Sequence, residues 1–353
     1  GGDCSKQRCC TGKGLQCYEK LKGWATCKSS CVPDAPDMLD VSADRWSCNP
    51  LGGRTPGPVP GVPHNVGAPA WAKDHCSAKE ANCAKTRCCQ DEGLQCFGKN
   101  QYYGQCMADC TAADGWSCTP MGMRTPKPWG KPSLFCFAVT RSTGYETDLL
   151  RAQIEGGMGI VACDEFAFLC SDPLTINGYK AVPFQSAVVG ISKDNTAANT
   201  ELFLHVWNAI KLDGRYKELD WTVKVDPDAV LLPDRLRGHL KPYTGGKSYI
   251  VNCNKPQMTP MMFGALECIS REGMEAYFAG ESSCTSGLPW APWGEDYFMG
   301  KCLDKLGVQA QNDFSIYTDG VCTGVNCQNA GAAAFHPFKN KDAWMGCYRT
   351  ATR

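Results

Sequence analysis

The 353-residue sequence has neither net charge nor a long apolar run, and both absences exclude classes of function. Lysine and arginine (36 residues) balance aspartate and glutamate (36 residues), and basic residues form no cluster. We therefore expect no nucleic-acid partner and no charge-driven membrane adhesion. No apolar run reaches the roughly 18 residues of a membrane helix, so we predict no membrane span. The start, Gly1-Gly2-Asp3, lacks a signal segment, and we expect that a secreted form has lost its leader.

Histidine is scarce, and Cys-x-x-Cys pairs and Asn-x-Ser/Thr sequons do not occur. The five histidines argue against structural zinc sites, and the missing sequon argues against ordinary N-glycosylation. Cysteine, in contrast, is abundant, with 25 residues that include the adjacent pairs Cys9-Cys10 and Cys88-Cys89. This density is typical of disulfides formed in a secretory pathway, so we predict a secreted, extracellular or Golgi-lumenal protein. Because the count is odd, one thiol is free, capped or bonded to another chain, which would allow self-assembly.

The first third of the chain contains an internal repeat. Six cysteines of the first copy return in the second with the same spacing: Cys4, Cys9, Cys10, Cys17, Cys27 and Cys31 match Cys83, Cys88, Cys89, Cys96, Cys106 and Cys110. Both copies close with Trp-Ser-Cys and Arg-Thr-Pro, and the second has an extra leading Cys76, whose counterpart would precede Gly1. Each copy has too few aliphatic side chains for a hydrophobic core alone. We predict two disulfide-rich modules, residues 1–56 and 76–126, with the spare cysteine in the first.

Composition marks two linkers and a larger domain. Residues 57–75 begin with a Pro/Gly-rich stretch that we expect to be extended, and residues 127–133 form a shorter joint. From residue 134 to residue 353, apolar strands alternate with amphipathic helices. We expect strands at 134–140, 159–162, 221–225 and 248–252, and helices at 145–155, 200–212, 233–240 and 270–279. This alternation favours an α/β domain with a mostly parallel sheet.

Two acidic motifs suggest chemistry in this domain. Asp226-Pro227-Asp228 follows the apolar stretch that ends at Val225, which puts two carboxylates at an exposed strand tip. A divalent cation held there would bridge protein oxygens and a diphosphate. Glu295-Asp296, at the start of an expected helix, would supply a general base. Together they suggest sugar transfer from a nucleotide-sugar, although Asp-Pro-Asp is also common in turns.

Four short segments resemble, in the same order, segments of the β-1,3-galactosyltransferase and Fringe group of glycosyltransferases. Residues 220–240 resemble its metal-binding segment, and residues 263–270 its strand-to-helix segment. Residues 295–308 resemble its Glu-Asp-Val motif with the following helix, and His336 stands where the family has a metal-ligating histidine. The sequence departs from the family at Pro227, where three consecutive acids are usual.

The resemblance implies a GT-A fold, which binds nucleotide-diphospho-sugars, with a UDP-sugar as donor. It implies that Asp226, Asp228 and His336 hold Mn²⁺ or Mg²⁺, although an isolated histidine is more often structural. Asp296, with Glu295 as the alternative, would deprotonate the acceptor hydroxyl in an inverting transfer. We also expect Asp164, after the strand at 159–162, to contact the nucleotide, unless it is a surface turn residue.

In the modules, residues 94–106 resemble the end of fungal-type cellulose-binding modules. Five aromatic residues are candidates for stacking on sugar rings: Tyr18, Trp24, Phe97, Tyr102 and Tyr103. Alternatively, these rings fill gaps in a small disulfide core. The first module is the poorer match, because Gly23 stands at the position of Tyr102.

The sequence therefore predicts a secreted or Golgi-lumenal, metal-dependent glycosyltransferase that two carbohydrate-binding modules anchor to a polysaccharide or glycan. The alternative is an extracellular structural or lectin-like cell-wall or filament protein with an inactive transferase-like domain. The spare thiol and the cysteine content favour this alternative. A secreted hydrolase has less support, because no nucleophile or spaced carboxylate pair is fixed by the sequence.

Overall fold

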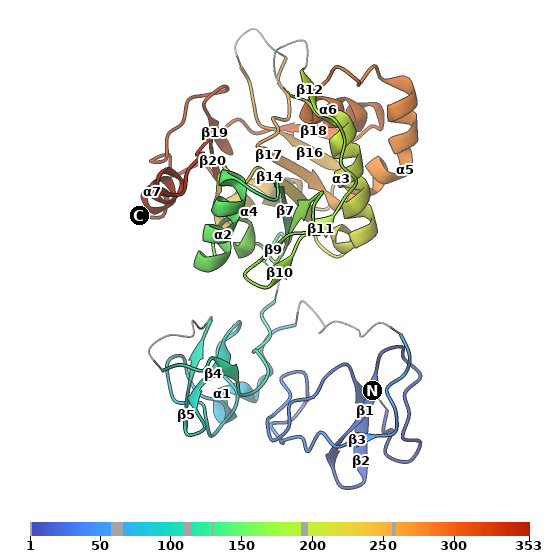
Figure 1. Ribbon diagram of the computed structural model, residues 1–353, viewed down its shortest axis with the longest axis vertical. Coiled ribbons are helices and arrows are strands. Elements are labelled where there is room, and N and C mark those ends of the chain that lie inside the picture. The colour runs from blue at the N-terminus through green and yellow to red at the C-terminus, as the bar shows by residue number, and fades with distance from the viewer. Residues whose placement is uncertain are drawn as a thin grey trace. The chain divides into compact units, whose positions relative to one another are not determined.

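The computed structural model describes residues 2–57, 66–108, 110, 115–128, 130–191, 197–255 and 259–353 (Figure 1). The chain forms two compact units, residues 1–129 and 130–353. Residues 58–65, most of the predicted extended stretch, lie outside the described residues, as does residue 129 of the second joint. In the described part of the chain, no helix is long and apolar enough to cross a membrane.

Each repeat of the first unit is built on a small antiparallel sheet. The hairpin strands pair with the same register in both repeats, Cys17 opposite Cys27 and Cys96 opposite Cys106. A two-residue third strand completes each sheet. The sheets are, in order across each, β2 (Trp24–Lys28), β1 (Gln16–Leu21) and β3 (Pro50–Leu51), then β5 (Tyr103–Met107), β4 (Gln95–Asn100) and β6 (Thr119–Pro120).

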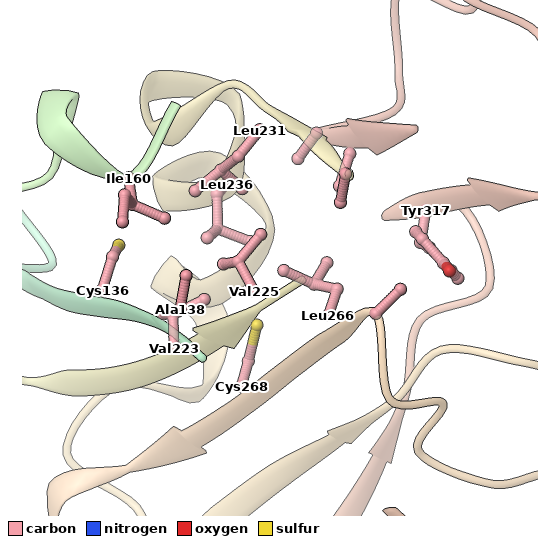
Figure 2. Packing of buried hydrophobic residues seen from close by; sticks show 14 of the residues in the cluster. Cys136, Ala138, Ile160, Val223, Val225, Leu231, Leu236, Leu266, Cys268 and Tyr317 are labelled. Atoms are coloured by element: carbon pink, nitrogen blue, oxygen red, sulfur yellow. The ribbon is translucent and has the colours of Figure 1, made fainter. Parts of the chain in front are cut away.

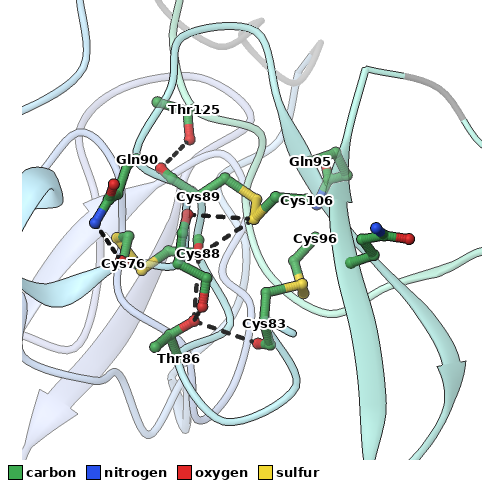
Figure 3. The surroundings of a disulfide bond; sticks show 12 residues. Cys76, Cys83, Thr86, Cys88, Cys89, Gln90, Gln95, Cys96, Cys106 and Thr125 are labelled. Carbon is green, nitrogen blue, oxygen red and sulfur yellow. Dashed lines mark hydrogen bonds between the residues drawn. A yellow bond between two sulfur atoms is a disulfide. The ribbon is translucent and has the colours of Figure 1, made fainter. Parts of the chain in front are cut away.

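Disulfides form the core of each repeat. Three pairs are equivalent between the repeats: Cys4–Cys17 and Cys83–Cys96, Cys10–Cys27 and Cys89–Cys106, Cys31–Cys48 and Cys110–Cys118. Figure 3 shows the Cys83–Cys96 and Cys89–Cys106 bonds of the second repeat, where Thr125 Oγ1 donates a hydrogen bond to the carbonyl of Cys89. Cross-links therefore replace the missing aliphatic core.

The spare cysteine is Cys9. In the second repeat Cys88 pairs with the extra Cys76, whereas its equivalent Cys9 is unpaired and exposed. The prediction of a spare cysteine in the first repeat is thus confirmed. Two further cysteines, Cys170 and Cys268, are also unpaired, but both are buried in the second unit.

A longer loop in the first repeat packs on residues that lead into the second. The Cys31–Cys48 pair spans 17 positions and the Cys110–Cys118 pair spans 8, so the first repeat has nine extra residues between these cysteines. From this loop Met38 packs with Ala72 and Cys88. Residues 72–75 of the expected linker consequently form a short helix, α1 (Ala72–His75), instead of extended chain.

The second unit contains a seven-stranded mixed sheet, so the predicted α/β fold with a mostly parallel sheet is confirmed. Four of its six strand pairs are parallel, and only the two pairs made by β17 are antiparallel. The order is β11 (Val182–Pro183), β8 (Glu165–Cys170), β7 (Leu134–Val139), β14 (Trp221–Val225), β17 (Leu266–Ser270), β16 (Ser248–Val251) and β18 (Gln309–Asn312).

Helices cover both faces of this sheet, with α2 and α4 on one side and α3 and α5 on the other (Figure 1). Alternation along β7 serves both faces: Cys136 and Ala138 pack with Ile160 and Leu236 (Figure 2), whereas Phe137 lies edge-on to Trp207 of α3. The helices are α2 (Tyr145–Gly156), α3 (Thr200–Asp213), α4 (Pro233–Leu240), α5 (Arg271–Gly287), α6 (Glu295–Lys305) and α7 (Lys341–Ala351).

A second, three-stranded sheet stands beside the main one. Its order is β15 (Val230–Leu231), β20 (Ala334–His336) and β19 (Tyr317–Asp319). Two-stranded ribbons pair β9 (Thr175–Ile176) with β10 (Tyr179–Lys180), and β12 (Gly190–Ile191) with β13 (Ala197–Ala198). Four disulfides fasten the unit: Cys136–Cys163, Cys253–Cys322, Cys284–Cys302 and Cys327–Cys347.

Most predicted elements of this unit are present, and one is wrong. The expected strand at 159–162 is a 3₁₀ helix, η1 (Gly159–Ala162), and further 3₁₀ turns are η2 (Arg215–Lys217) and η3 (Lys241–Tyr243). Gly157 ends α2 with a left-handed conformation and Gly159 has φ +63°, so the chain turns here and cannot extend. The strand follows instead, as β8, and Asp164 precedes it.

Candidate functional site

A cavity lies where the parallel strands β11, β8, β7 and β14 end. From β7 the chain continues to β8 and β11 on one side, whereas β14 lies on the other side of β7. At such a point the connections diverge and leave a crevice outside the carboxyl ends of the strands. The cavity has a volume of about 500 Å³, and residues following each of these strands line it: Arg141, Asp172, Phe184, Asp226 and Asp228.

Asp226, Asp228 and His336 converge in this cavity. Their ligand atoms all lie within 4.8 Å of one another, and His336 Nε2 is 3.4 Å from Asp228 Oδ1. The pairing of β15 with β20 brings His336 beside the loop that follows β14. Side chains from two helices fix this loop, because Gln153 donates to the carbonyl of Pro227 and Trp344 to that of Ala229.

A buried carboxylate orients His336. Its Nδ1 lies 2.5 Å from Oδ2 of Asp319, which is opposite it in the parallel β19–β20 pair. Tyr317 donates to the same oxygen at 2.6 Å, and the backbone N–H of Val321 donates to Oδ1. Burial alone would lower the pKa of His336, but the carboxylates of Asp228 and Asp319 outweigh it and raise it to about 9.

These residues fit a divalent cation. Two carboxylates and one imidazole nitrogen form a donor set that Mn²⁺ accepts, and the carboxylates also suit Mg²⁺. A carboxylate hydrogen-bonded to the far nitrogen of a histidine is the usual support of a metal-ligating histidine. Asp319 is fully buried and has that position. The cluster therefore has both the ligands and the supporting contact that a metal site needs.

Lys224 connects this cluster to the carboxylates of neighbouring elements. Its buried Nζ lies 2.9 Å from Asp226, 3.3 Å from Glu267 and 2.7 Å from Glu295. Glu267 is directly opposite Lys224 in the β14–β17 pair. Burial, and then the Glu267 carboxyl, raise the pKa of Glu295 well above its ordinary value. The buried ammonium of Lys224 thus links the two buried carboxyls of Glu267 and Glu295 to the partly exposed carboxylate of Asp226.

Glu295 and Asp296, the two base candidates, face different cavities. Glu295 lines the large cavity but is committed to Lys224, whereas Asp296 lines a second cavity of about 250 Å³ with Tyr249 and Tyr297. A base for the same reaction would be expected to line one cleft with Asp226, Asp228 and His336. For Asp296 this expectation is wrong, because successive residues in the first turn of α6 point in different directions. Asp296 accepts hydrogen bonds from the N–H groups of Gly264 and Tyr297. Burial, and then the charge of Glu295, raise its pKa to about 7.

Asp164 is not among the residues that line the large cavity, so that cavity gives no support to its expected contact with a nucleotide. Its carboxylate accepts hydrogen bonds from the N–H groups of Gly130 and Leu134 and from Arg237. Leu134 begins β7, so Asp164 is at the amino end of the sheet. What is wrong is its expected position after a strand at 159–162, since Asp164 precedes β8.

The five aromatic residues predicted to stack on sugars differ in exposure. Tyr102 is 77% exposed, Tyr103 38% and Trp24 37%. Tyr18 and Phe97 are half-buried, each against an arginine of its own repeat. Their role in carbohydrate binding stays a prediction.

Several residues of the site were not predicted from the sequence. Arg141 and Lys339 add positive charge to the cavity lining, and Tyr145 lies near Asp228. Asp319 hydrogen-bonds to His336, and Lys224 forms an ion pair with Asp226. The sequence does indicate partners for Lys224, because a lysine inside the buried strand Trp221–Val225 requires buried carboxylate partners.

Comparisons with known proteins add little to this geometry. No protein-family model matches the chain, and no curated protein matches its sequence. One solved structure similar to it is a glycosyltransferase involved in the glycosylation of the major capsid of PBCV-1. It is 9% identical with a TM-score of 0.40, and the match covers 62% of this chain and 100% of that one. We therefore base function on the chain's own residues.

Proposed function

We propose that residues 130–353 form a metal-dependent, inverting glycosyltransferase domain of the GT-A kind, with a UDP-sugar as donor. The convergence of Asp226, Asp228 and His336 at the strand ends supports this most directly. When bound there, Mn²⁺ or Mg²⁺ would supply positive charge that neutralises the diphosphate of the donor. Arg141 and Lys339, which line the same cavity, would add charge for the phosphate oxygens.

The second cavity is suited to the acceptor. Tyr297 and Trp293 make an edge-on aromatic pair 4.9 Å apart beside Asp296, and such rings stack on the apolar faces of sugars. In the transfer, the acceptor oxygen bonds to the anomeric carbon while the bond from that carbon to the diphosphate breaks. The diphosphate leaves with the electron pair, and the hydroxyl proton passes to Asp296. Attack opposite the leaving group inverts the configuration.

We further propose that the two repeats bind a polysaccharide or glycan and that the protein acts outside the cytosol. The eleven disulfides are typical of an oxidising, extracellular or lumenal compartment. The exposed rings of Tyr102 and Tyr103 support a glycan partner.

Calorimetry on the full chain tests the transferase site. UDP and a UDP-sugar should bind in millimolar Mn²⁺ and not in excess chelator. Asp228→Asn should lose this binding, whereas Asp74→Asn, which removes an exposed carboxylate of the first unit, should keep it. Failure of the unmutated protein to bind UDP or any UDP-sugar would overturn the proposal. It would favour the extracellular structural or lectin-like alternative.

A further inference from the structure

Both ring nitrogens of His239, near the end of α4, face hydrogen-bond acceptors. Its Nδ1 is 2.7 Å from Oδ2 of Asp313, and its Nε2 is 2.7 Å from the carbonyl oxygen of Gly331. The side chain is 17% exposed, so both contacts lie largely out of water. A carbonyl oxygen cannot donate a hydrogen bond, so Nε2 must carry a proton.

Asp313 does not supply a proton to the ring either. Burial tends to raise the pKa of Asp313, but the hydrogen bonds from His239 and Ser315 outweigh it and lower the pKa to about 2. An ionised carboxylate only accepts, so Nδ1 of His239 must donate as well. Only the imidazolium has a proton on both nitrogens. The hydrogen bond to Asp313 accordingly raises the pKa of His239.

The neighbouring ionisable groups do not change their charge near neutral pH. Arg235, one turn earlier on α4, donates to two carbonyls of the turn 329–332, at 3.2 and 3.1 Å, and its guanidinium stays charged. Cys268 of β17 stays a neutral thiol, because burial raises its pKa. Among the described residues, no further ionisable side chain is hydrogen-bonded to His239 or Asp313. His239 is therefore the group that makes this place sensitive to pH.

The two partners of His239 lie on the turns that lead into β19 and β20. Asp313 Oδ1 accepts from the N–H of Ile316, at 3.1 Å, and so holds the turn before β19. Gly331 belongs to the turn before β20. The carbonyl of Ile316 accepts from the N–H groups of residues 333–334, at 2.9 and 3.2 Å, which joins the two turns. The imidazolium of His239 thus closes a ring of contacts at the start of both strands.

These two strands carry the pair that supports the candidate metal site. Asp319 is opposite His336 in the β19–β20 pair, and their hydrogen bond orients the imidazole of His336. We propose that His239 is a positioning residue for this pair, and that the Asp319–His336 contact weakens when His239 loses its proton. The inference adds a pH control to the site of the proposed function and, for its effect on a bound cation, rests on that function.

Nuclear magnetic resonance of the metal-free full chain, with nitrogen-15-labelled histidine, tests the proposal independently of UDP binding. At about pH 7 the ring of His239, assigned with His239→Gln, should have protons on both nitrogens. In His239→Gln the Nδ1–H of His336 should exchange with water about tenfold faster than in the parent, because a charged hydrogen bond is lost. His205→Gln is the matched control and should leave the His336 signal unchanged, since His205 Nδ1 contacts the backbone carbonyl of Gln185 and no carboxylate.

Denaturant unfolding tests whether the charge of His239 matters. Because its pKa is raised in the folded protein, the stabilisation is complete below the ordinary pKa of 6.5 and is lost as pH rises through the folded pKa. At about pH 5.5 the equilibrium constant of unfolding should be about tenfold larger in His239→Gln than in the parent, and the two should converge at alkaline pH. Asp313→Asn keeps the ring but removes the charge, so its loss of stability should begin at lower pH than in the parent.

Three results would overturn the proposal: a neutral His239 ring at about pH 7, equal exchange of the His336 proton in His239→Gln and the parent, or an unfolding difference that does not change with pH. Failure of the parent to bind Mn²⁺ or UDP would instead overturn the proposed function, and none of these three measurements requires either ligand. Glutamine can donate to the carbonyl of Gly331 at any pH, so His239→Gln should fold.

Discussion

His336 Nδ1 lies 2.5 Å from Oδ2 of Asp319, a carboxylate with no exposed surface. Burial tends to raise the pKa of Asp319, but the hydrogen bonds from His336, Tyr317 and the N–H of Val321 together outweigh it, and the pKa is lowered. An ionised carboxylate can only accept, so Nδ1 donates and Nε2 faces Asp228. The pair presents Nε2 to a cation and keeps the imidazole from rotating.

Asp319→Asn should therefore weaken Mn²⁺ binding about ten- to hundredfold, because the orienting charge is lost while the three ligands remain. Titration with Mn²⁺ alone, followed by calorimetry, measures this without any requirement for turnover. Asp74→Asn removes an equal charge from the first unit and should have no effect. Unchanged Mn²⁺ affinity in Asp319→Asn would show that the pair only holds β19 to β20.

Asp296 should give the transferase reaction its dependence on pH. With a pKa of about 7, the carboxyl is protonated and unable to accept a proton at lower pH, and it becomes a base as pH rises through 7. We expect kcat/KM to rise between about pH 6 and pH 8. Asp296→Asn should bind the donor with Mn²⁺ as the parent does and lose turnover. Comparable turnover in this variant would assign the base elsewhere, and Glu295→Gln would then be the next variant to assay.

Loss of the Lys224 cation should lower the free energy of unfolding more than loss of one carboxylate that contacts it. Lys224→Met leaves the carboxyls of Glu267 and Glu295 buried without a counter-ion, which costs about 3–5 kcal/mol. Burial raises the pKa of both carboxyls, so one of them is readily neutral, and Glu267→Gln imitates that state. Its cost should be much smaller. Denaturant unfolding of the two variants checks this, and equal destabilisation would contradict it.

The sequence predicted those parts of the second unit that depend on local patterns. The strand Trp221–Val225 and the helix Pro233–Leu240 have the predicted bounds, because the apolar run and the proline at the helix start act locally. That Asp226 and Asp228 lie at a strand end follows from the same strand. Local patterns therefore sufficed to place two of the three candidate metal ligands.

The parts of the structure that the sequence did not predict depend on contacts between distant segments. Asp319 reaches His336 through two three-residue strands, which are too short for a periodic pattern. Glu267 lies opposite Lys224 in an antiparallel pair of strands, and no pattern in the sequence shows that these two strands pair. The contacts of Asp40 with Lys20 and Trp46 depend on where the longer loop of the first repeat folds back, and the spacing of the cysteines gives only its length.

The three unpaired cysteines should differ in reactivity. The thiolate is the reactive form, and burial raises the pKa of Cys170 and, to a greater extent, that of Cys268. Cys9 is exposed. A thiol reagent should therefore react quickly with one thiol in the folded protein and with three after unfolding without reductant. Cys9→Ser should abolish the fast reaction, and Cys170→Ser should not.

The same cysteine should permit a covalent dimer. Cys9 has no partner within the chain, whereas its equivalent Cys88 is bonded to Cys76, so mild oxidation should join two chains through Cys9. Non-reducing electrophoresis should show a dimer that Cys9→Ser prevents and Cys170→Ser does not. A monomer only, with its fast-reacting thiol intact after oxidation, would exclude the intermolecular bond. Two or more fast thiols before oxidation would instead mean that one of the eleven disulfides does not form.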